Sequence, residues 1–117
     1  MIDRPSLREK LNLPVETVDD VAKLVTQWAI DRGICDNSDL KSQALKTVSE
    51  VGEFCDNVLK GRETIDDVGD ILVTLQIHCH LKGISLSQCF RAAYDEVSKR
   101  KGKMVNGTFI KEGDNIK

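Results

Sequence analysis

The chain has 117 residues, of which 40% are hydrophobic and 31% are charged. This length fits a single domain spanning residues 1–117, and the apolar content is too high for a disordered chain. A formal net charge of -2 argues against a protein that binds nucleic acid through bulk electrostatics. Because a chain this small buries only a modest core, we expect a homo-oligomer, a dimer or tetramer, that covers apolar helix faces.

The N-terminal stretch MIDRPSLREKLNLPVE has no apolar signal segment, and no apolar run in the chain reaches membrane-spanning length. We therefore expect a cytoplasmic protein with no membrane partner. The cysteines form no CxxC pair, so we expect free and mostly buried thiols rather than disulfides or a zinc site. They are Cys35, Cys55, Cys79 and Cys89.

Capping and stop residues predict four helices in chain order. A capping box of Thr17 with Asp20 begins the first helix, and a second box of Thr64 with Asp67 begins the third. Glycines follow the ends of the helices, as is typical of helix termination. The predicted helices span residues 17–33, 38–60, 64–83 and 85–102.

Strand-like alternation is absent until the stretch MVNGTFI, where Asn106-Gly107 can turn a short hairpin. The predicted fold class is therefore all-α, with a helical core over about residues 17–102. Short loops favour antiparallel neighbours, which predicts an antiparallel four-helix bundle followed by a short C-terminal hairpin or extended tail.

Four carboxylates repeat one spacing on the second and third predicted helices. Glu50 and Glu53 lie three residues apart, as do Asp67 and Asp70. Projected at about 100° per residue, the glutamates lie opposite the apolar stripe of their helix, in a polar seam with coiled-coil-like spacing. A solvated face with a weak Lys46–Glu50 pair is the alternative. The stripe contains Leu40, Ala44, Val48, Val51, Cys55 and Val58, and the seam contains Gln43, Lys46, Glu50, Glu53 and Asn57.

The third helix is apolar on two sides, as expected of a central helix. Asp70 lies beside these stripes, so we expect packing around a carboxylate that is paired, neutralised or bound to metal. If both acidic pairs face one seam, any two carboxylates about 4 Å apart would repel by roughly 4 kcal/mol at an effective dielectric constant near 20. A divalent cation is therefore expected between them. All-oxygen ligands suit Mg²⁺ or Mn²⁺. Gly52 and Gly69 lie inside the two pairs and are expected to permit close helix approach.

The stretch EVGEF followed by DDVGDILVTL, behind a helix that contains Trp28, resembles the MazG-like branch of the all-α nucleoside triphosphate pyrophosphohydrolases. The family pattern is ExxE, a linker and ExxD. Glu50, Glu53 and Asp70 match it residue by residue, whereas Asp67 stands where the family usually has Glu. The ending AYDEVSKRKGKMVNGTFIKE is similar to small single-domain members often encoded by phages, which implies the host cytoplasm as the compartment. The resemblance covers roughly residues 18–111.

The resemblance implies Mg²⁺-dependent hydrolysis of nucleoside triphosphates, with deoxynucleotides as the first expectation, to the monophosphate and pyrophosphate. Glu50, Glu53, Asp67 and Asp70 would hold the metal ions, and water would attack the α-phosphorus. Either Glu50 or Glu53 would act as general base, and the sequence does not choose between them. The expected substrate contacts are Lys46, Arg100 and Lys103 with phosphate, and Trp28 and Tyr94 with the base, core packing being the alternative for the aromatic residues.

Two other functions stay open at this point. Phosphoribosyl-ATP is an alternative substrate within the same chemistry. A non-catalytic helical interaction module, whose acidic groove binds a basic partner, is the alternative outside enzymes. A single-stranded nucleic acid is not an expected partner, because an aromatic content of 4% supplies few stacking platforms.

Overall fold

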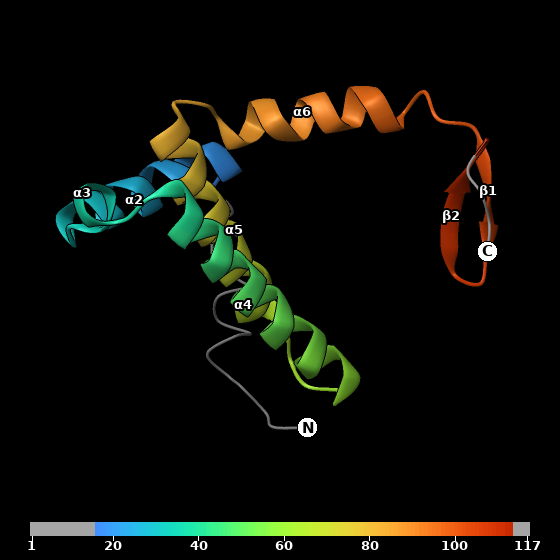
Figure 1. Cartoon of the computed structure of the whole chain (residues 1–117), viewed down its shortest axis with the longest axis horizontal. Helices are drawn as coiled ribbons and strands as arrows, with labels where there is room; N and C mark the ends of the chain where they lie inside the picture. The colour runs from blue at the N-terminus through green and yellow to red at the C-terminus, as the bar shows by residue number, and fades with distance from the viewer. Residues whose placement is uncertain (1–15, 114–117) are drawn as a thin grey trace. The chain divides into compact units, whose positions relative to one another are not determined.

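A computed structural model describes residues 16–113 of the chain (Figure 1). It divides into two compact units, Met1–Leu86 and Ser87–Lys117. The all-α class and the C-terminal hairpin are confirmed, whereas the four-helix bundle and the single domain stay predictions. The described elements are α2 (Val18–Asp31), α3 (Ile34–Asn37), α4 (Leu40–Leu59), α5 (Ile65–Lys82), α6 (Leu86–Val97), β1 (Gly102–Val105) and β2 (Thr108–Lys111).

The first unit is built around the pair of α4 and α5, which lie side by side, with α2 packed against α5 (Figure 1). Its core is small and unusually polar. Among the described residues, the buried apolar side chains are Ala29, Ile77 and Cys79. The buried polar ones are Gln43, Glu50, Asp67 and Thr74.

α4 packs through its polar seam and leaves its apolar stripe outside. Gln43 and Glu50 are each 8% exposed, whereas Val48 on the stripe is 68% exposed. A solvated face is therefore the wrong interpretation for Glu50. Periodicity had identified the two faces of this helix correctly, but which face meets α5 is decided by contacts between helices.

The predicted start of α2 is confirmed. The Thr17 hydroxyl accepts a hydrogen bond from the backbone N–H of Asp20 at 3.1 Å, and the Asp20 carboxylate accepts one from the Thr17 N–H at 3.4 Å. α4 is capped by Asp39, one residue after residue 38, where the helix was predicted to begin. The carboxylate of Asp39 accepts from the backbone N–H of Ser42 at 2.7 Å, which lowers the pKa of Asp39.

The predicted capping box of Thr64 and Asp67 is wrong, because the Thr64 side chain makes no capping hydrogen bond. The Glu63 carboxylate instead accepts hydrogen bonds from the backbone N–H groups of Thr64 and Ile65, at 2.8 and 3.2 Å. Asp67 is thereby left to point toward α4.

The second unit contains the hairpin, whose strands pair antiparallel from Gly102↔Lys111 to Val105↔Thr108. Asn106 and Gly107 have φ values of 51° and 82°, the positive values that a two-residue type I′ turn requires. α6 ends at Val97, five residues before the predicted stop, and β1 begins at Gly102. None of the helices in residues 16–113 combines the length and apolarity that a membrane span needs.

Candidate functional site

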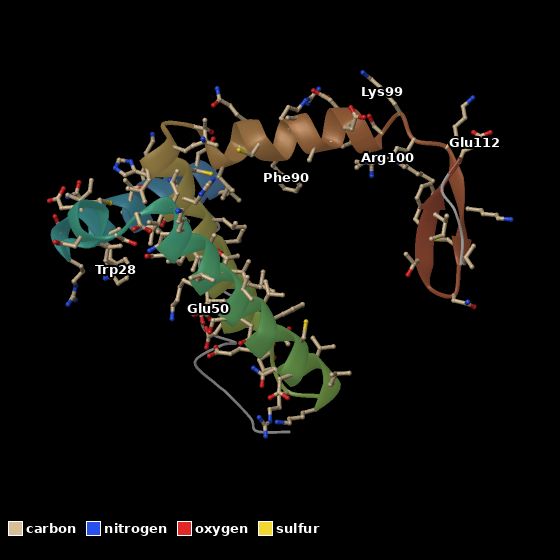
Figure 2. The ribbon with its side chains drawn as sticks, viewed as in Figure 1. Trp28, Glu50, Phe90, Lys99, Arg100 and Glu112 are labelled. Carbon is tan, nitrogen blue, oxygen red and sulfur yellow. The ribbon has the colours of Figure 1, made fainter. Side chains whose placement is uncertain are left out.

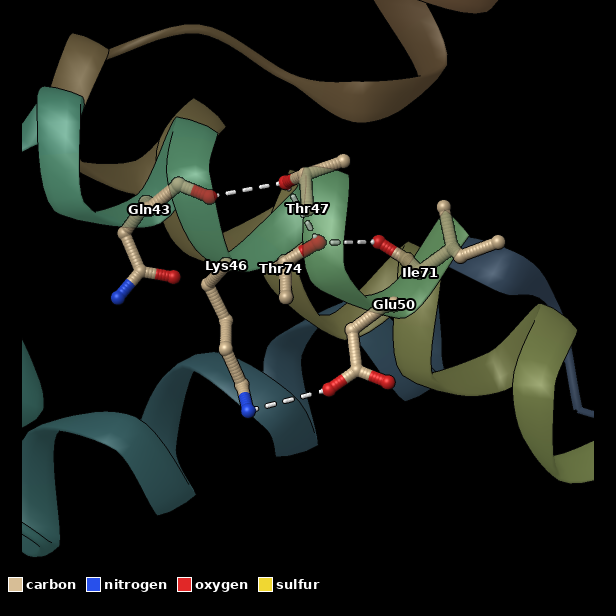
Figure 3. Close-up of polar contacts among 6 residues, drawn as sticks. All are labelled: Gln43, Lys46, Thr47, Glu50, Ile71 and Thr74. Carbon is tan, nitrogen blue, oxygen red and sulfur yellow. Dashed lines mark hydrogen bonds and ion pairs between the residues drawn. The ribbon is translucent and has the colours of Figure 1, made fainter. Parts of the chain in front are cut away.

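Glu50 lies on the inner face of α4 with its two carboxylate oxygens in different environments (Figure 3). The Lys46 ammonium approaches Oε1 to 3.2 Å from one turn earlier on the helix. Oε2 is buried and has no hydrogen-bond partner among the described residues. A buried carboxylate oxygen without a partner costs free energy, so this atom is where a cation or a proton donor would be stabilising.

Asp67 is the second buried acid, at 7% exposure, and lies on α5. Its Oδ2 accepts a hydrogen bond of 2.9 Å from Nδ2 of Asn57 on α4. This contact joins the two helices near the acidic pairs. Sequence reasoning had placed Asn57 in the polar seam but had given it no role.

Asp70 is exposed, so the expectation that packing would surround it is wrong. Its pKa is nevertheless raised, first by partial desolvation and then by repulsion from Glu50, Asp66 and Asp67, with Lys46 acting in the opposite direction. The repulsion from Glu50 crosses from α4 to α5. Glu50 and Asp70 are therefore close enough for their charges to interact, whereas a metal site shared by the four acids stays a prediction.

Glu53 is exposed, and within residues 16–113 no hydrogen bond or ion pair connects it to the other three acids. In the same part of the chain, no three His, Cys, Asp or Glu side chains lie close enough together to chelate one ion. The structure thus brings Glu50, Asp67 and Asp70 into one neighbourhood without closing a cage around a cation.

An apolar groove of about 480 Å³ runs between α2 and α5 beside these acids. Asp66, Gly69 and Asp70 lie along it. A Cβ added at Gly69 or at Gly52 would meet no atom within 4 Å, so the expected role of these glycines in close approach of α4 and α5 is wrong. The groove is also lined by Val21, Ala22, Val25, Leu72, Val73 and Gln76.

Two threonines link α4 and α5 one turn from Glu50 (Figure 3). The Thr47 hydroxyl donates to the Thr74 hydroxyl at 2.8 Å, and Thr74 donates to the carbonyl of Ile71 at 2.7 Å. Thr47 also lies 2.9 Å from the carbonyl of Gln43, which competes for its single hydrogen. This link holds the two helices in register beside the buried carboxylate. It joins residues 27 positions apart, so no local pattern could have revealed it.

The predicted substrate contacts are divided between the two units. In the first unit, the Lys46 side chain is 59% exposed and Trp28 projects from α2 at 46% exposure, so the core interpretation of Trp28 is wrong (Figure 2). In the second unit, Tyr94 carries the guanidinium of Arg91 over its ring at 5.5 Å. Arg100 and Lys103 are exposed there. The roles of all these side chains toward substrate stay predictions.

Comparison with known proteins gives one informative match. The chain is 35% identical over 57 residues to an uncharacterized 18.2 kDa protein of Haemophilus phage HP1, from the rep-hol intergenic region. The match covers 47% of this chain and 35% of the phage protein, so the chain spans about a third of that relative. No protein-family model matches the chain, and no solved structure matches it significantly.

Proposed function

We propose that the chain is a Mg²⁺-dependent nucleoside triphosphate pyrophosphohydrolase of the MazG-like kind, which converts deoxynucleoside triphosphates to the monophosphate and pyrophosphate. One observation carries the proposal. Oε2 of Glu50 is buried without a partner among the described residues, next to a second acid, Asp70, whose pKa is raised by desolvation and then by the Glu50 charge. Such an arrangement of acids is costly unless a cation compensates for it.

The residues fit a magnesium ion. Mg²⁺ is commonly held by carboxylates together with water and substrate phosphates. In the proposal Glu50 and Asp70 are the principal ligands, and Asp67 and Glu53 complete the set. Mn²⁺ prefers similar oxygen ligands and would substitute. Bound there, the metal supplies neutralisation of phosphate charge and a water of lowered pKa.

Proton transfer, phosphate contact and nucleoside binding are assigned to different side chains of the protein. Either Glu50 or the exposed Glu53 takes the proton from the attacking water in this proposal. Attack forms a bond from the water oxygen to the α-phosphorus and breaks the bond to the pyrophosphate oxygen. The Lys46 ammonium, which is mostly exposed, can leave Glu50 and contact phosphate oxygens. The apolar groove between α2 and α5 offers its walls to the nucleoside.

The proposal includes an antiparallel four-helix bundle, a homo-oligomer and a location in the cytoplasm, which is the host cytoplasm if the chain is phage-encoded. The similarity to a protein of Haemophilus phage HP1 supports a phage origin. The small apolar core of the described residues supports assembly of several copies.

A panel of nucleoside triphosphates and phosphoribosyl-ATP, each incubated with Mg²⁺, tests the proposal by separate assays for pyrophosphate and orthophosphate. We expect pyrophosphate together with the monophosphate, and a loss of at least about a hundredfold in kcat for Glu50→Gln and Asp70→Asn. Asp56→Asn is the matched control, because Asp56 lies on the same helix in an exposed pair with Lys60 at 2.8 Å. Release of orthophosphate alone would contradict attack at the α-phosphorus. Inertness toward the whole panel would favour the helical interaction module.

A further inference from the structure

A positive charge of the protein itself lies at the buried carboxylate of Glu50. Nζ of Lys46 is 3.2 Å from Oε1 of Glu50, one turn away on the same helix (Figure 3). The Lys46 side chain is 59% exposed, whereas the Glu50 side chain is 10% exposed. The ammonium is therefore mostly in water while it contacts a carboxylate that is almost withdrawn from water.

This ion pair differs from the exposed pair at the end of the same helix. Lys60 and Asp56 are 2.8 Å apart, but their side chains are 51% and 54% exposed. Such a pair contributes little to stability, because water solvates both charges when the pair opens. Water cannot solvate Glu50 in the same way, since its Oε2 is buried and has no hydrogen-bond partner among the described residues. Lys46 therefore supplies compensation that Glu50 needs while no metal is bound.

Lys46 also acts on an acid of the neighbouring helix. Its charge is close enough to Asp70 on α5 to attract it, and this attraction opposes the repulsion of Asp70 by the other acids. Lys46 is thus within electrostatic range of one acid on α4 and one on α5. These two acids, Glu50 and Asp70, are the principal metal ligands of the proposed function.

We propose that the Lys46 ammonium competes with the metal for this site, neutralising Glu50 in the metal-free protein and leaving it when a divalent cation binds. The inference rests on the proposed function, because it needs a metal at these acids. A cation that approaches Oε1 of Glu50 meets a positive charge 3.2 Å from that oxygen, and the two cations repel. Lysine has a flexible stem, and this one is mostly exposed, so the ammonium can turn into water while α4 stays folded.

The competition makes substrate phosphate part of metal binding. A metal that arrives alone displaces Lys46 from Glu50 and leaves the ammonium without an acidic partner at the site. A metal that arrives with a triphosphate brings oxygens that accept hydrogen bonds from the displaced ammonium. The site therefore discriminates against the free ion and in favour of the metal–nucleotide complex.

Binding of Mn²⁺ to the full chain without nucleotide tests the competition, with the electron paramagnetic resonance signal of the free ion as the measurement. We expect Lys46→Gln to bind Mn²⁺ about tenfold more tightly than the wild type, because the competing charge is gone. Lys46→Arg keeps the charge and should bind like the wild type. Lys60→Gln is the matched control, since it removes the same charge from the exposed pair on this helix and should leave the Kd nearly unchanged.

The outcomes separate this inference from the proposed function. If Lys46→Gln binds Mn²⁺ no more tightly than the wild type, the competition is overturned while the proposed ligands stand. If Lys46→Gln and Lys60→Gln tighten binding equally, the effect is one of net charge, and the competition is overturned as well. If neither the wild type nor Lys46→Gln binds Mn²⁺, the metal site itself is wrong and both proposals fall.

Acylation of lysines by an N-hydroxysuccinimide ester, followed by peptide mass spectrometry, tests the displacement in the wild type. Saturating Mn²⁺ should increase the labelling rate of Lys46 severalfold, because the ammonium is no longer held by Glu50. Lys60 in the same sample should keep its rate, since its pair with Asp56 is not part of the site. A Lys46 rate that does not respond to saturating Mn²⁺ would overturn the displacement.

Discussion

Asn57 on α4 donates a hydrogen bond of 2.9 Å to the buried carboxylate of Asp67 on α5. The acceptor is charged and 7% exposed, so water cannot fully replace the amide if it is removed. We expect Asn57→Ala to lower the free energy of unfolding by about 1.5–3 kcal/mol, as measured by urea denaturation. Gln27→Ala removes a 2.8 Å amide–carboxylate bond to Asp31 at an exposed site and should cost much less. Equal decreases in the free energy of unfolding of the two variants would show that the burial of Asp67 does not strengthen its hydrogen bond.

Asp70 should destabilise the metal-free protein at neutral pH. Its pKa is raised by desolvation and by repulsion from Glu50, Asp66 and Asp67, with Lys46 opposing, so the folded state binds a proton more tightly than the unfolded chain. The penalty is absent at pH values below the unfolded pKa and appears as pH rises through the folded pKa. In EDTA at pH 7, Asp70→Asn should therefore have a higher Tm than the wild type, and the difference should vanish in acid.

Magnesium should reverse the order of the Tm values of the wild type and Asp70→Asn. Added Mg²⁺ should raise the Tm of the wild type by binding the folded state alone, and Asp70→Asn should lose most of that rise. Asp36→Asn, an exposed change on α3, should keep it. A wild-type Tm that does not respond to Mg²⁺ would contradict the proposed ligands, whatever the substrate is.

Two of the local signals in the sequence were reliable, whereas the equally local Thr64–Asp67 box was not. The Thr17–Asp20 capping box depends on residues three apart, and the Asn106-Gly107 turn depends on two adjacent residues that tolerate positive φ. Both were predicted correctly because the interactions that decide them lie within one turn of chain. The cysteines were expected to be free, as they are, but Cys55 and Cys89 are exposed rather than buried.

Which of the acids are buried is decided by contacts between helices, and the sequence alone does not show these contacts. The spacing predicted that the pairs on α4 and α5 would face one another; the charge of Glu50 acts on Asp70 across the two helices, and the place of Glu53 in a shared site stays a prediction. It did not predict that Asp67 would be buried and Asp70 exposed. The sequence also allowed Asp67 a role in capping its own helix. In the structure Asp67 instead accepts a hydrogen bond from Asn57 on another helix. Periodicity separates the faces of a helix, but tertiary packing selects the face that is buried.

The hydroxyls of Thr47 and Thr74 should contribute to stability as a pair. Thr74→Val removes the acceptor of the 2.8 Å bond at a position that is 4% exposed, and we expect a loss of about 1 kcal/mol in the free energy of unfolding. Thr47→Val should cost a similar amount. Because replacing both partners by apolar groups of the same shape leaves no unpaired hydroxyl, the double variant should lose less than the sum. Strict additivity in urea denaturation would show that the two side chains are not coupled.

Gly69 should be replaceable by alanine with a gain in stability. It lies inside α5, where glycine costs roughly 0.5–1 kcal/mol relative to alanine, and an added Cβ would meet no atom within 4 Å. We expect Gly69→Ala to raise the free energy of unfolding by about that amount and to retain binding of Mg²⁺. Gly33→Ala is the contrasting change, because φ at Gly33 is 76° and a Cβ there would lie 3.2 Å from the Asn37 amide, so it should destabilise. Loss of stability in Gly69→Ala would instead indicate that α4 or α2 approaches this glycine more closely in the assembled protein.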